Sequence, residues 1–141
     1  MSEGLAVRDV MKSPAPYIKQ GAALGDVVET LRKYGVMGLP VVSQTGSVVG
    51  FVSEQDCIHS MLVSSYHCEG APIVDDVMFT EVLSARPDQN IVDLAQAMGK
   101  NKPKLYPVID DGTLVGLITR SDILQALWES RSHCDAPSKI A

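Results

Sequence analysis

The sequence has few cysteines, no excess of positive charge and no long apolar run, and each absence narrows what the protein can be. Its three cysteines are an odd number, which argues against a disulfide framework. The formal net charge is −5 and the pI is near 5.0. Broad electrostatic binding to nucleic acid or to an anionic membrane is therefore not expected.

No segment approaches the roughly 20 apolar residues that a membrane-spanning helix requires. Met1 is followed by Ser2-Glu3-Gly4 rather than by the basic and then apolar region of a secretory signal. We therefore expect a cytoplasmic protein with no membrane insertion. Apolar residues make up 45% of the chain and charged residues 21%, which is typical of a globular fold.

A short phrase occurs twice, as GFVSEQD at residues 50–56 and as GLITRSD at residues 116–122. The similarity extends upstream, because Asp9-Val10-Met11 recurs as Asp76-Val77-Met78 at a shift of 67 (78 − 11 = 67). The final aspartates of the two phrases differ by 66 (122 − 56 = 66), so one residue has been lost in between. The chain therefore contains two tandem copies of one unit. Since half of a 141-residue chain alone would be marginally stable, we expect the copies to share a core.

The sequence pattern of each copy predicts the same order of secondary-structure elements, β-α-β-β-α. A short extended stretch comes first, at 15–18 and at 81–84. An amphipathic helix follows near 24–34 and near 91–100, where apolar residues recur at i, i+3, i+4 and i+7. Gly35 is well placed to end the first of these helices.

The second part of each copy predicts a β-hairpin and a helix. The hairpin strands are 39–42 with 48–52 and 106–109 with 114–118, each pair joined by a polar, glycine-containing turn. The last helix starts near Ser53 or Thr119, with apolar residues Ile58, Met61 and Leu62 in the first copy and Ile123, Leu124 and Leu127 in the second. The predicted fold class is α+β, with a first unit at 1–63, a linker at 64–72, a second unit at 73–130 and a flexible C-terminal tail at 131–141.

The repeated phrase has two interpretations. Ser53 or Thr119, followed three residues later by Asp56 or Asp122, is the pattern of a capping box that closes a helix start. The same helix start also offers free N–H groups and a partial positive charge to a phosphate. A hydroxyl can add a hydrogen bond to that phosphate, and the carboxylate suits the paired hydroxyls of a ribose. The pattern is therefore also consistent with nucleotide binding.

In its doubled order the chain resembles a tandem pair of cystathionine-β-synthase (CBS) domains, also called a Bateman module. The resemblance rests on the Val-Met segments, the strands containing Pro40 and Pro107, and the phrase Gly-apolar-apolar-Ser/Thr-x-x-Asp, and it covers roughly residues 6–130. It implies two units packed sheet to sheet around a pseudo-two-fold axis. It also implies two clefts that bind adenine-containing ligands, namely AMP, ADP, ATP, S-adenosylmethionine or NAD-type molecules.

For the first cleft, the resemblance assigns the phosphate hydroxyl to Ser53 and the ribose carboxylate to Asp56. Adenine contacts should come from Val82 and Leu83 of the other copy, and Lys104 is expected to reach the phosphate. For the second cleft, the corresponding residues are Thr119 and Asp122, with Ala15 and Pro16 expected beside the adenine.

The charged residues do not show which of the two clefts is better suited to bind a phosphate. Arg120 beside Thr119 favours phosphate in the second cleft, whereas Glu54 beside Ser53 disfavours it in the first. Lys104 favours the first cleft instead. Pro14 and Pro16 also depart from the polar residues that are usual in the family's first strand.

Two other groups of residues carry side chains that can bind metal or pack at an interface. His67-Cys68, His133-Cys134 and the Cys57/His59 pair could be imagined as metal ligands or a catalytic pair, but their spacing is not that of a zinc site and no orienting third group is visible. We therefore predict no metal and no catalytic residues. Trp128 near the end of the last helix is interpreted as core or interface packing.

We interpret the chain as a regulatory module without enzymatic activity and with no obligatory cofactor, which responds to an adenosyl ligand by a change of conformation or association. The resemblance implies a homodimer, and a separate enzyme or transporter is a possible regulated partner. An alternative is a constitutive dimeric scaffold with empty clefts. A nucleotide hydrolase is a third hypothesis, but no base, nucleophile and electrophile arrangement supports it.

Overall fold

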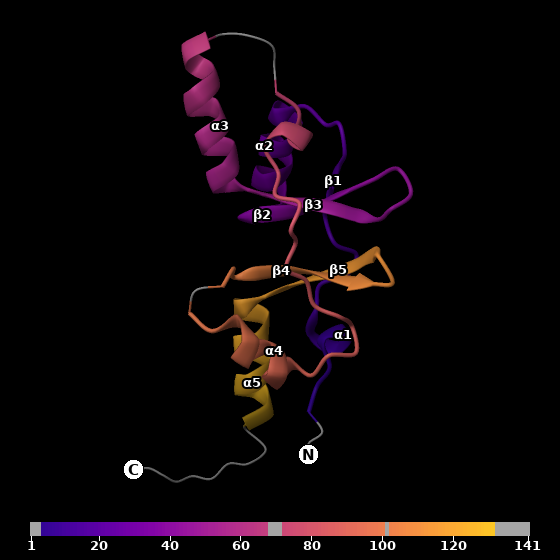
Figure 1. Ribbon diagram of the computed structural model, residues 1–141. Helices are drawn as coiled ribbons and strands as arrows, with labels where there is room; N and C mark the ends of the chain where they lie inside the picture. The colour runs from indigo at the N-terminus through magenta and orange to yellow at the C-terminus, as the bar shows by residue number, and fades with distance from the viewer. Residues whose placement is uncertain (1–3, 68–71, 101, 132–141) are drawn as a thin grey trace, which may run out of the picture.

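The computed structural model describes residues 4–67, 72–100 and 102–131. The elements form four layers, with helices outside and two sheets facing each other in the middle (Figure 1). One outer layer holds α2 and α3, and the other holds α1, α4 and α5. The α+β class and the tandem arrangement predicted from the sequence are confirmed.

The first unit contains a three-stranded sheet in the order β1-β2-β3, with β1 parallel and β3 antiparallel to β2. Its elements are β1 (Ile18–Lys19), α2 (Leu24–Tyr34), β2 (Gly38–Val42), β3 (Val48–Ser53) and α3 (Glu54–His67). Helix α2 buries Leu24, Val27 and Leu31 against the sheet, and Gly35 ends it in the left-handed conformation at φ 62°. That conformation suits glycine because it has no Cβ.

The second unit contains the antiparallel pair β4-β5. Its elements are η1 (Val74–Asp76), α4 (Ile91–Met98), β4 (Leu105–Asp110), β5 (Thr113–Thr119) and α5 (Arg120–Arg131), and the chain begins with α1 (Val7–Val10). The Asn90 side chain caps α4 by accepting hydrogen bonds from the N–H groups of Val92 and Asp93.

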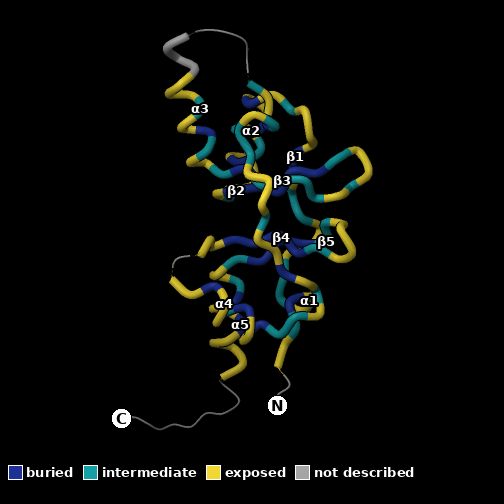
Figure 2. Tube along the Cα trace, in the orientation of Figure 1, coloured by how far each residue is buried: buried dark blue, intermediate teal, exposed yellow. Residues whose placement is uncertain are grey.

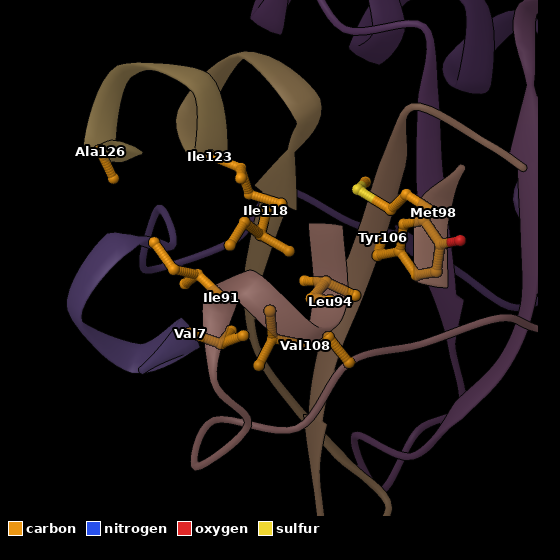
Figure 3. Packing of buried hydrophobic residues seen from close by; sticks show 10 residues of the cluster. Val7, Ile91, Leu94, Met98, Tyr106, Val108, Ile118, Ile123 and Ala126 are labelled. Atoms are coloured by element: carbon orange, nitrogen blue, oxygen red, sulfur yellow. The ribbon is translucent and has the colours of Figure 1, made fainter. Parts of the chain in front are cut away.

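The segment that begins each unit packs on the other unit. Residues 5–12 lie against the second unit, and residues 72–79 lie against the first; we call these the crossing segments. Val7 is buried among Ile91, Leu94 and Val108 of the second unit (Figure 3). Val74 is buried in the same way within the core of the first unit. The two halves are therefore interlocked.

Matching backbone bonds hold the two crossing segments. The Lys12 N–H donates to Leu117 O at 2.8 Å and the Leu117 N–H donates to Lys12 O at 3.0 Å. Phe79 and Phe51 exchange the same two bonds in the first unit, both at 2.9 Å. Each segment thus extends the edge of the other unit's hairpin by one antiparallel bridge.

The glycine of each repeated phrase makes room for a methionine of the crossing segment. A Cβ added to Gly50 would lie 2.5 Å from the Met78 Sδ and 2.8 Å from the Phe79 carbonyl oxygen. A Cβ added to Gly116 would lie 2.5 Å from the Met11 Sδ and 3.0 Å from the Lys12 carbonyl oxygen. The repeated Val-Met motif of one unit therefore packs directly against the repeated glycine of the other unit.

Some expectations need correction. The halves do not share one core, because the buried residues form two clusters, one per unit, joined by the exchanged segments. The extended stretch expected at 81–84 forms no strand, and only Ala85 bridges to Val108 of β4. Helix α3 continues to His67 and so enters the range expected for the linker, whose residues 68–71 lie outside the described part of the chain. The expected tail also lies outside it, except for Arg131 at the end of α5.

Substituting alanine for Gly50 or Gly116 should destabilise the fold. Because the added Cβ meets a backbone oxygen as well as a methionine, we expect each change to cost about 1–3 kcal/mol of unfolding free energy. Urea denaturation followed by circular dichroism measures the cost. Gly25→Ala in α2 is the control: no atom lies within 4 Å of its added Cβ, so it should stabilise by about 0.5–1 kcal/mol. Equal stability of all three variants would contradict the proposed packing role.

Candidate functional site

Each repeated phrase forms a capping box at a helix start. In the first copy the Ser53 N–H and hydroxyl donate to Asp56 Oδ2 at 3.0 and 2.8 Å, and the Asp56 N–H donates to Ser53 Oγ at 3.1 Å. In the second copy the Thr119 N–H donates to Asp122 Oδ2 at 2.9 Å, and the Asp122 N–H donates to Thr119 Oγ1 at 3.0 Å. The capping-box interpretation is confirmed in both copies.

Each capping box uses only the Oδ2 oxygen of its aspartate. The Oδ1 oxygens of the two aspartates differ in their hydrogen-bond partners. Asp122 Oδ1 accepts a hydrogen bond from Lys12 Nζ at 2.5 Å, in an ion pair that joins the crossing segment to α5. Asp56 Oδ1 has no hydrogen-bond partner among the described residues. Only the first copy therefore offers an open carboxylate oxygen.

The difference arises from one position in the crossing segments. Lys12 and Phe79 are 67 residues apart (79 − 12 = 67), the same shift that separates the two Val-Met segments. They make equivalent bridges, to Leu117 and Phe51 respectively. Neither residue belongs to a motif predicted to carry the site, although both directly follow the repeated Asp-Val-Met.

A cavity of about 270 Å³ lies where β2 of the first unit meets β4 of the second. It is lined by Ser53 and Lys104, which are expected together in the first cleft. The remaining lining is largely apolar and comes from Met37, Gly38, Phe51, Pro103 and Leu105. Asp56 does not line this cavity itself but is hydrogen-bonded to Ser53, which does.

Val82 and Leu83 do not line this cavity, although they were expected beside Ser53 and Asp56. Val82 is half-buried and Leu83 is exposed, in the stretch between the Phe79 bridge and the Ala85 bridge.

The residues expected in the second cleft are not brought together. Ala15 lines a different cavity, of about 540 Å³, with Thr113, Leu114 and Val115 at the start of β5, whereas Asp122 follows the end of that strand. Pro16 does not line that cavity. Asp122 lines a third hollow, of about 440 Å³, with Asp9 and Val10 of α1.

Arg120 and Glu54 occupy matching places beside the two hydroxyls. Both side chains are exposed, and their N–H groups donate to the carbonyls of Lys104 (2.8 Å) and Met37 (2.9 Å) respectively. These bonds tie each helix start to the start of the neighbouring strand. The Lys104 backbone is therefore fixed where this residue lines the cavity of about 270 Å³.

Comparison with known families agrees with this geometry. The CBS domain matches twice, over residues 7–63 and 74–129. The chain belongs to the CBS domain family. The two matches coincide with the two units of the fold, so the chain carries a CBS pair.

The similar proteins differ in how much of their own length this chain covers. The uncharacterized protein MJ1426 of Methanocaldococcus jannaschii is 31% identical, over 89% of this chain and 92% of its own. The A-adding tRNA nucleotidyltransferase of Aquifex aeolicus is also 31% identical over 89% of this chain, but the match covers only 15% of that enzyme. Among solved structures, the CBS-pair protein CBSX2 of Arabidopsis thaliana in complex with AMP has a TM-score of 0.77 and 29% identity, over 91% of this chain and 99% of its own.

Cys57 of the CBS pair is a core residue rather than a reactive thiol. Its side chain is 2% exposed and packs in the core of the first unit. Burial raises the pKa of the Cys57 thiol, and the neighbouring carboxylates of Asp56 and Glu54 raise it further. The thiol therefore stays protonated at neutral pH and is a poor nucleophile.

The part of the chain that the structure describes contains no group of three His, Cys, Asp or Glu residues that could hold a metal ion. Cys68, His133 and Cys134, which were weighed as ligands, lie outside the described residues. Among the described helices, none is long and apolar enough to cross a membrane.

The outer faces of α3 and α5 are apolar and exposed (Figure 2). The exposed residues occupy matching positions at a shift of 66, and they are Ile58, Met61 and Leu62 on α3 and Leu124, Leu127 and Trp128 on α5. The faces that pack inward carry Cys57 on α3 and Ile123 and Ala126 on α5. Trp128 is 62% exposed, so it does not pack in the core of this chain.

The capping boxes should contribute to stability independently of any ligand. Ser53→Ala and Thr119→Ala each remove the side-chain acceptor of a helix-capping bond, so we expect each to cost about 0.5–2 kcal/mol of unfolding free energy. Thermal and urea denaturation without ligand measure this. Ser121→Ala on the exposed first turn of α5 is the control and should change stability by less than about 0.5 kcal/mol. A Ser53 or Thr119 variant as stable as this control would show that the caps contribute little.

Proposed function

We propose that this CBS pair is a regulatory module that binds an adenosine-containing ligand in the cavity lined by Ser53 and Lys104, beside Asp56. The observation that carries the proposal is that Ser53 and Lys104 line one largely apolar cavity, beside the Asp56 carboxylate with one open oxygen. The Ser53 hydroxyl and the Asp56 carboxylate are engaged with each other in the capping box at the start of α3, so we propose binding rather than turnover.

The chemistry of the cleft matches the parts of a nucleotide. Phe51, Met37 and Leu105 offer apolar surface to a purine ring. Asp56 Oδ1 can accept hydrogen bonds from ribose hydroxyls while Oδ2 keeps the capping box closed. Lys104 can pair with a phosphate, and the N-terminus of α3 adds a favourable dipole.

The comparison supports the ligand class. CBSX2, which is 29% identical to this chain over nearly its whole length, was crystallised with AMP. We therefore take AMP as the first ligand to test, with ADP, ATP, S-adenosylmethionine and NAD-type molecules as further members of the class. The ligand acts as a regulator in this proposal, and no obligatory cofactor is invoked.

The exposed apolar faces of α3 and α5 suggest how ligand binding could be transmitted to another protein chain. Each unit has one such face, on α3 in the first unit and on α5 in the second. We propose that these two faces pack against those of a second copy and so form a homodimer. A ligand held between the sheets would change the angle between the units, and therefore between α3 and α5, if it bound one angle more tightly. A cytoplasmic location and a separate regulated enzyme or transporter are parts of this proposal.

A second candidate function is a constitutive dimeric scaffold. It is favoured by the capping boxes, because Ser53 and Thr119 already have hydrogen-bond partners without a ligand. In that case the helix faces associate and the cleft stays empty. The two candidates separate cleanly, since only the first predicts ligand-dependent stabilisation.

AMP should raise the melting temperature of the protein through the Asp56 cleft. A ligand at a hundredfold excess over its dissociation constant adds about 2.7 kcal/mol to stability. We expect Asp56→Ala to abolish the shift and the matched variant Asp122→Ala to keep it. Lys104→Ala should weaken AMP binding by roughly tenfold while leaving adenosine binding unchanged, because only AMP carries the phosphate. A shift that survives Asp56→Ala would exclude this cleft, and no shift with any adenosyl ligand would favour the scaffold.

The dimer should depend on the outer faces of α3 and α5. Leu124→Glu places a charge on the exposed α5 face and should convert the dimer into a monomer, because burying an unpaired carboxylate is costly. Light scattering after size-exclusion chromatography measures the mass. Gln96→Glu on the exposed side of α4 is the control and should leave the mass unchanged. A Leu124→Glu protein that stays dimeric would place the interface elsewhere.

A further inference from the structure

The two carboxylates of the repeated phrases are alike in their capping bonds and unlike in their second oxygen. Lys12 Nζ bonds to Asp122 Oδ1, whereas the equivalent residue beside the first copy, Phe79, has no side-chain donor. Both residues are held in place by the same pair of backbone bonds to the neighbouring hairpin. The difference between the copies is therefore one of side-chain chemistry at a shared position.

We propose that Lys12 masks the ribose acceptor of Asp122, so that the chain binds one adenosyl ligand, in the Asp56 cleft. The residue at this position of the crossing segment decides whether a copy is open, as with Phe79, or closed, as with Lys12. The inference rests on the proposed function for the identity of the ligand, but the masking itself is a property of Lys12 and Asp122.

The ion pair is well placed to compete with a ribose. The Asp122 side chain is 11% exposed, so its carboxylate is partly withdrawn from solvent and poorly screened. A charge-assisted hydrogen bond from an ammonium group is stronger than the bonds that neutral ribose hydroxyls would make in its place. The Lys12 side chain is 69% exposed, so its alkyl stem is not tightly packed and can be replaced without opening a cavity.

The positive groups near Asp122 support an intramolecular mask. Arg120 is exposed on the same helix start and makes no ion pair among the described residues. Lys12, which comes from the other half of the chain, is the cation that contacts the carboxylate. The mask is thus delivered by the crossing segment, and it closes the second copy only while that segment lies in its bridge with Leu117.

The mask can be removed or transplanted. Lys12→Met keeps the length and apolar stem of the side chain but removes the ammonium group. Phe79→Lys places an ammonium group at the matching position beside Asp56. Isothermal titration calorimetry with AMP, on the full chain, measures stoichiometry for wild type and both variants, and melting temperatures without ligand confirm that each variant is folded.

We expect one AMP per chain in the wild type and two in Lys12→Met. Binding of the second AMP should be lost again in the double variant Lys12→Met/Asp122→Asn. This result distinguishes binding at Asp122 from binding at another site that the Lys12→Met change creates. Phe79→Lys should lower the affinity of the remaining site by roughly tenfold or more.

Each other outcome is informative. Two AMP molecules per wild-type chain, or one in both wild type and Lys12→Met, would overturn the mask. AMP binding by Lys12→Met but not by wild type would support the mask and contradict the proposed Asp56 site. Absence of binding in every variant would overturn both.

Discussion

The structure depends on the exchange of the two crossing segments between the units. Val7 completes the core of the second unit and Val74 completes the core of the first, so neither unit buries its core without the other. The methionine within each crossing segment, Met11 or Met78, needs the glycine of the other unit's repeated phrase. Burial of apolar surface thus fixes the order of the motifs along the chain and couples the folding of the two halves.

The same exchange produces a symmetric fold with an unsymmetric site. Backbone bonds at the crossing position are the same in both copies, because hydrogen bonding of a strand edge does not depend on the side chain. Side chains at that position are free to differ, and they do: Lys12 reaches Asp122, and Phe79 leaves Asp56 open. A duplicated unit can in this way keep its packing while its two clefts acquire different ligand preferences.

Much of the fold was predictable from the sequence because repetition and periodicity are local signals. The helices near 24–34 and 91–100, the second of which ends at Met98, the two hairpins and both capping boxes follow from apolar spacing, glycine placement and the Ser/Thr-x-x-Asp pattern. The exchange of the crossing segments was not predictable, because nothing in a Val-Met motif says which unit it packs against. The Lys12–Asp122 contact spans 110 residues, so no local pattern revealed it.

The central claim is that the crossing position leaves the Asp56 cleft open and closes the Asp122 cleft. A crystal structure of the protein grown with AMP tests it most directly. The account predicts electron density for AMP beside Ser53, Asp56 and Lys104, with the Lys12–Asp122 ion pair intact. AMP bound at Asp122 with Lys12 displaced, and no AMP at Asp56, would contradict it.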